Sequence, residues 1–124
     1  MHIVLAVREA QLMEVLWERG PCTVAEVRGS LHDELAYTTV LTILRNLEGK
    51  GYVGHEEEGR AHRYRALVAR DAARRSALRD LSFKFFKGST SLLMAHLVSD
   101  AALSDEEIRR IRRLLGRKTP LEKS

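Results

Sequence analysis

Apolar residues recur with helical spacing near the start of the chain. Between residues 8 and 19, Leu12, Val15 and Leu16 share one stripe, which is typical of an amphipathic helix with one buried face. The glycine and proline at 20–21 end this helix, because proline cannot continue the hydrogen-bonding pattern.

A second, short helix is indicated directly afterwards. Thr23 and Glu26 have the spacing of a capping box, in which each side chain accepts a hydrogen bond from the backbone amide of the other residue. Val24, Val27 and Leu31 supply its apolar face.

The third helix has the strictest pattern. From about Thr38, four apolar residues fall at positions i, i+3, i+4 and i+7: Val40, Ile43, Leu44 and Leu47. Gly49 and Gly51 close it. The period then changes to that of strands over 52–57 and 61–67, on either side of a turn at 58–60. Three helices and a hairpin in this order predict a winged helix-turn-helix domain over residues 1–67.

The pattern becomes helical again over 68–124. Helices are expected over 70–86 and 91–98, and a third after a second capping box at Ser104 and Glu107, with a frayed polar tail from about 118. The fold class is therefore mainly α with a small β-hairpin. So many apolar residues need more cover than one short chain offers, which favours a helical dimerisation region. Packing of these helices on the winged domain of a monomer is the alternative. The expected dimer contacts are Leu78, Leu81, Phe85, Leu92, Leu93, Leu97, Ile108, Ile111 and Leu115.

Candidate DNA contacts lie opposite the apolar stripe of the third helix. Such a helix enters the major groove and reads base edges and phosphates with its outer face. A polar outer face is common to most surface helices, so the hairpin adds the more specific signal: one arginine at its tip, and Arg63 and Arg65 on one face of the returning strand. The expected contacts are Thr38, Thr39, Thr42, Arg45, Asn46, Arg60 and Arg63.

The net charge of +4 supports this interpretation less than it first suggests. Residues 1–67 hold eight lysines and arginines against ten aspartates and glutamates, a net charge of −2, whereas residues 68–124 carry +6. The placement of individual cations must therefore carry the argument. A winged-helix adaptor that binds proteins and not DNA stays the alternative function.

Four segments together resemble the penicillinase repressor family, of the BlaI and MecI type, over nearly the whole length. They are LMEVLWERGPCTVAEV, YTTVLTILRNLEGKGYV, EGRAHRYRALV and LSDEEIRRIRRLL. The resemblance implies a homodimeric repressor whose winged domains bind a palindromic operator in double-stranded DNA and whose C-terminal helices pair with each other.

The chain departs from its apparent relatives at two places. Members that respond to β-lactams are cut by a membrane-bound sensor metalloprotease at an Asn-Phe pair, and in the corresponding stretch SLLMAHLVSD this chain has His96-Leu97. That partner is thus implied only by the resemblance. The copper-responsive repressors have paired cysteines near the C-terminus, which this chain lacks.

No catalytic set, cofactor motif, metal site or small-molecule substrate is predicted, so an enzyme is the weakest option. The five histidines are scattered; His55 and His62 could face each other across the hairpin, but two ligands are fewer than a metal site normally has. Cys22 is the single cysteine, which suits a reducing cytoplasm and a buried structural role. Neither a signal peptide nor a membrane span is expected.

Overall fold

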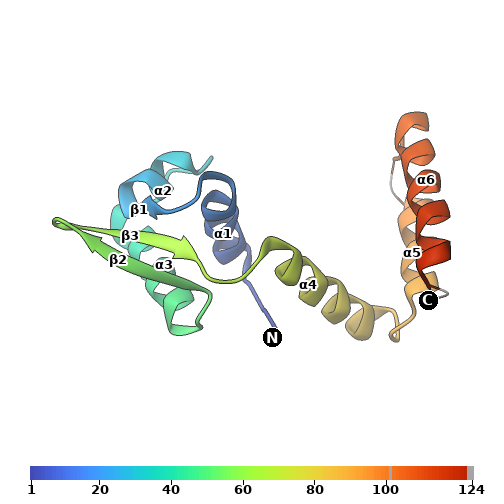
Figure 1. Ribbon diagram of the computed structural model, residues 1–124, viewed down its shortest axis with the longest axis horizontal. Coiled ribbons are helices and arrows are strands. Elements are labelled where there is room, and N and C mark those ends of the chain that lie inside the picture. Colours follow the sequence, from blue (N-terminus) through green and yellow to red (C-terminus); the bar gives the residue numbers. More distant parts are fainter. Residues whose placement is uncertain (101, 123–124) are drawn as a thin grey trace. The chain divides into compact units, whose positions relative to one another are not determined.

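A computed structural model describes residues 1–100 and 102–122, and side chains up to residue 117. Over this part of the chain it has six helices and one small sheet (Figure 1), which confirms the predicted fold class. The elements are α1 (Val7–Arg19), β1 (Cys22–Thr23), α2 (Val24–Ser30), α3 (Tyr37–Gly49), β2 (Val53–Glu58), β3 (Ala61–Ala66), α4 (Arg70–Phe85), α5 (Thr90–Asp100) and α6 (Asp105–Glu122). No helix among the described residues has the length and apolar character needed to cross a membrane.

The core lies where α1, α2 and α3 meet the sheet. Val40, Leu44 and Leu47 of α3 are fully buried, as their spacing predicts, while Ile43 is half-buried at the edge. Leu12 and Met13 of α1 pack into the same cluster. The inner stripe of α3 therefore fixes which residues its outer face presents to solvent.

The sheet contains one strand more than the sequence indicates. Its order is β1-β3-β2 with both pairings antiparallel, and the register sets His55 opposite Tyr64 and Glu57 opposite His62. Gly59 has a φ of 63°, the left-handed conformation that glycine adopts without strain, and it makes the hairpin turn. β1 has only two residues, too few for an alternating pattern.

The capping boxes form as predicted. The Glu26 amide donates to Thr23 Oγ1 at 3.2 Å and the Thr23 amide donates to Glu26 Oε1 at 2.9 Å. Ser104 and Glu107 repeat the arrangement at the start of α6. This helix continues to Glu122, through the stretch where the sequence predicts a frayed tail; residues 123–124 lie outside the described part.

The chain divides into two compact units, Met1–Asp80 and Leu81–Ser124, so the first unit extends beyond the predicted boundary after residue 67. The reason is a set of contacts that hold the first half of α4. The Ile3 amide donates to Ser76 Oγ at 3.1 Å, and Trp17 Nε1 donates to the Val68 carbonyl at 2.9 Å. Arg70 lies over the Trp17 ring.

An ion pair between a buried carboxylate and a half-exposed lysine ties α1 to the end of α3. Lys50 Nζ lies 3.0 and 2.8 Å from the two carboxylate oxygens of Glu9, which also accepts a hydrogen bond from the amide of Ala6, the residue that precedes α1. Burial by itself raises the pKa of Glu9, but the hydrogen bonds from Lys50 and Ala6, and the charge of Lys50, outweigh it and lower the pKa below its ordinary value.

We expect Glu9→Gln to destabilise the unit Met1–Asp80 by about 1–2 kcal/mol at neutral pH. This is the contribution of a hydrogen-bonded ion pair whose lysine is half exposed. Because the folded-state pKa is lowered, the stabilisation is complete above the unfolded-state pKa and is lost as the pH falls through the folded-state value. Urea unfolding of both proteins from pH 7 to pH 3 should show the difference closing at acid pH. A constant difference would assign the effect to packing.

Candidate nucleic-acid interface

The outer face of α3 presents the predicted polar residues together. Thr38, Thr39, Thr42, Arg45 and Asn46 are all exposed, since the inner stripe of the helix is buried. Thr42 Oγ1 donates to the Thr38 carbonyl at 2.8 Å. This bond leaves the Thr42 hydroxyl oxygen able to accept and its methyl group free to pack against an apolar atom.

Arg45 stands at the side of this face nearest the hairpin. Its neighbour there is Tyr64 of β3, which is almost fully buried. Burial raises the pKa of Tyr64 and the charge of Glu48 adds to this, while the charge and hydrogen bonding of Arg45 act in the opposite direction. The guanidinium of Arg45 therefore lies beside Tyr64, between α3 and the β2–β3 hairpin.

The hairpin places its arginines in different surroundings. Arg60 is exposed in the turn, where the sequence predicts it, and Arg65 is exposed on β3. Arg63 is held instead: its Nε donates to Glu58 at 2.7 Å, and its Nη1 donates to Glu26 and to the Pro21 carbonyl, each at 3.1 Å.

The two carboxylates around Arg63 compete with any phosphate for its guanidinium. The pKa of Arg63 is raised above its ordinary value, first by its hydrogen bond to Glu58 and then by the charges of Glu58 and Glu26. The geometry thus favours a role in joining the wing to the capping box of α2. The strand alternation predicts the face of Arg63 but not the acidic partners on it.

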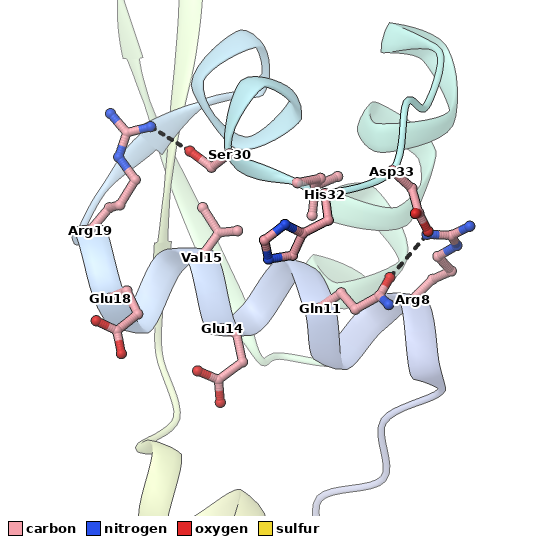
Figure 2. A pocket seen from close by; sticks show the side chains of 10 residues that line it. Arg8, Gln11, Glu14, Val15, Glu18, Arg19, Ser30, His32 and Asp33 are labelled. Carbon is pink, nitrogen blue, oxygen red and sulfur yellow. Dashed lines mark hydrogen bonds and ion pairs between the residues drawn. The ribbon is translucent and has the colours of Figure 1, made fainter.

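A hollow of about 530 Å³ lies between α1 and the α2–α3 turn (Figure 2). Arg8 Nη1 donates to Asp33 at 2.7 Å at one side, and Arg19 Nη1 donates to Ser30 Oγ at 2.6 Å at the other. The His32 ring extends over α1 between them. Both arginines are thus hydrogen-bonded to the segment that ends α2 and leads to α3.

The alternative chemistries gain no support from the geometry. Cys22 is buried and its thiol donates to the Gly20 carbonyl, and burial raises its pKa, which makes it less reactive. His55 and His62 stack with ring centroids 4.5 Å apart, so that their nitrogens do not converge on one point. Within the described residues, no three histidine, cysteine or carboxylate side chains are grouped as metal ligands.

The comparison with known families decides what kind of protein this is. The model of the family described as "Penicillinase repressor" matches residues 5–117. The chain belongs to the penicillinase repressor family.

Two relatives of this penicillinase repressor family member show how far the likeness extends. It is 42% identical over 66 residues to the transcriptional regulator BlaI of Mycobacterium tuberculosis, over 51% of this chain and 48% of that protein. The chain thus spans about half the length of that relative. It is 20% identical over 112 residues to the methicillin resistance regulatory protein MecI of Staphylococcus aureus, over 89% of this chain and 91% of MecI.

Solved structures agree on the fold. A MarR family protein from Bacillus stearothermophilus superposes with a TM-score of 0.54 at 20% identity, over 98% of this chain and 78% of that one. The complex structure of hsRosR-S4 superposes with a TM-score of 0.54 at 16% identity, over 94% of this chain and 91% of that one. The winged helix-turn-helix fold and the family are therefore confirmed. The family description and the names of both relatives are those of gene regulators.

Proposed function

We propose that this repressor is a homodimer that binds a palindromic operator in double-stranded DNA in a sequence-specific manner and acts in the cytoplasm. The observation that carries the proposal is the outer face of α3, where Thr38, Thr39, Thr42, Arg45 and Asn46 are all exposed. Hydroxyl, amide and guanidinium groups are the groups that read base edges in the major groove.

The dimer is supported by apolar exposure. In one chain Leu78 is 55% exposed and Phe85 69%, and Leu81, Leu92, Leu97 and Leu115 are also exposed. Leu93 is buried within its unit, and Ile108 and Ile111 are half-buried, so these three are expected to support the helices from inside. In a symmetric dimer a second copy of the chain covers this apolar surface, and the same surface of that copy is covered in return.

A symmetric dimer explains why the operator should be palindromic. Its two α3 helices would bind half-sites about one helical turn, roughly 34 Å, apart. We assign DNA binding to the winged domain, with its compact unit ending at Asp80, and dimerisation to the helices beyond it together with the exposed side chains of α4.

Arg45→Ala is expected to weaken operator binding by about 1–3 kcal/mol, the contribution of a two-pronged contact from an arginine to guanine. Binding of a labelled duplex that carries the promoter upstream of the gene, measured by fluorescence anisotropy, tests this. Binding to an unrelated duplex should change little, because a base contact discriminates between sequences.

Arg60→Ala is the matched comparison, since Arg60 is also exposed but lies at the hairpin turn. It should weaken binding to both duplexes alike and reduce the salt dependence, as loss of a phosphate contact does. Absence of any sequence preference, or affinity that does not fall as salt rises, would contradict the repressor mechanism and favour the protein-binding adaptor.

A membrane-bound sensor metalloprotease as partner stays a prediction of the family resemblance. His96 and Leu97 are exposed on α5, within a regular helix. A protease binds its substrate as an extended strand, so cleavage there requires α5 to unwind first.

A further inference from the structure

A stacked pair of histidines occupies the corner between the wing and the recognition helix. The rings of His55 on β2 and His62 on β3 lie 4.5 Å apart with an interplanar angle of 13°. Both side chains are partly exposed, 30% for His55 and 40% for His62. Tyr64 borders them from β3, and Arg45 lies beside that tyrosine.

The two histidines have unequal counter-charges. His55 Nδ1 lies 2.7 and 2.8 Å from the two oxygens of Glu48 on α3, close enough for a full hydrogen bond. His62 Nε2 is 3.8 Å from Glu57 of β2, a side chain that is 77% exposed. The carboxylate of Glu48 is therefore hydrogen-bonded to His55, whereas that of Glu57 stands beyond hydrogen-bonding distance of His62.

From these contacts we propose that His62 is a further DNA-backbone contact, which takes up a proton when a phosphodiester approaches the corner between α3 and the hairpin. The inference rests on the proposed DNA-binding function. A phosphate beside His62 supplies the counter-charge that Glu57 supplies only weakly, and so favours the imidazolium form in the complex. The neighbouring Arg45 and the hairpin turn make this corner continuous with the proposed interface.

Proton uptake by His62 in the complex sets the direction in which DNA binding depends on pH. Because the complex holds the His62 proton more tightly than the free protein does, lowering the pH from 8 to 6 strengthens DNA binding, across the range in which histidines titrate. Uptake of one full proton changes the affinity about tenfold per pH unit. Since the contact is to the backbone, an unrelated duplex should show the same dependence as the promoter duplex.

The test is anisotropy titration of the full-length protein with both duplexes at fixed salt between pH 6 and pH 8. His62→Gln should flatten the pH dependence, while His2→Gln, a histidine in the same unit that pairs with Asp80, should leave it unchanged. His62→Lys carries a fixed charge and should bind tightly at every pH without proton uptake. Thermal unfolding of each variant checks that the wing is intact.

The results separate the two levels of the proposal. Binding with an undiminished pH dependence in His62→Gln, or weaker binding by a stable His62→Lys protein, would overturn the histidine contact and leave the repressor function standing. Failure of the unaltered protein to bind either duplex at any pH would overturn both.

Discussion

Replacing Leu78 and Leu81 by aspartate is expected to give a monomer that binds the operator about 10²–10⁴-fold more weakly than the unaltered protein. Both side chains are exposed on α4 in the single chain, at 55% and 40%, and an apolar interface does not tolerate unpaired carboxylates. Two linked winged domains gain an affinity advantage of this size because the second half-site binds at a high effective concentration. Light scattering with size-exclusion chromatography gives the mass, and anisotropy the affinity.

Arg79→Asp is the matched control for this double variant. It introduces aspartate on the same helix at an exposed polar position and changes the net charge by the same two units. It should remain dimeric and lose only the affinity that follows from lost positive charge. A double variant that is monomeric but retains full operator affinity would contradict the homodimeric mechanism.

Leu44→Ala is expected to destabilise the winged domain by about 2–5 kcal/mol. Leu44 is fully buried between α1, α2 and the sheet, so that truncation leaves a cavity that the rigid surroundings fill only partly. The melting temperature should fall by about 10 °C or more. Circular dichroism during heating measures this, and operator binding should decline with the folded fraction.

Leu41→Ala serves as its comparison. Leu41 lies on the same helix, three residues earlier, and is only half-buried at the rim of the core. Its truncation should destabilise the winged domain clearly less than Leu44→Ala does. Equal losses at the two positions would mean that α3 is not packed by the stripe described above.

The sequence predicts best what a repeated pattern specifies. The spacing of Val40, Leu44 and Leu47 indicates the inner face of α3, and by elimination the outer face that carries the proposed contacts. The capping boxes follow equally directly, because each depends on two residues three positions apart. These local rules are sufficient for the fold class.

Contacts between distant residues are what the sequence does not reveal. The pairing of Arg63 with Glu26 depends on β1 lying beside β3. A two-residue strand is too short for its pairing to be predicted from a sequence pattern. The stack of His55 on His62 likewise depends on the register of the hairpin. The actual limit of the first unit depends on Ser76 meeting Ile3, a contact with no local signature.

The contact between Ile3 and Ser76 also orders events during synthesis. Ile3 is 3% exposed in the finished protein, yet the residue that binds its amide is made 73 residues later. At the usual rate of about 5–20 residues per second, the beginning of the chain stays uncovered on the ribosome for about 4–15 s after its own synthesis, and still for about 0.5–2 s after the wing is complete. The winged domain is therefore finished by its last segment and not by its first, and a nascent chain gains its full stability only once the start of α4 has emerged.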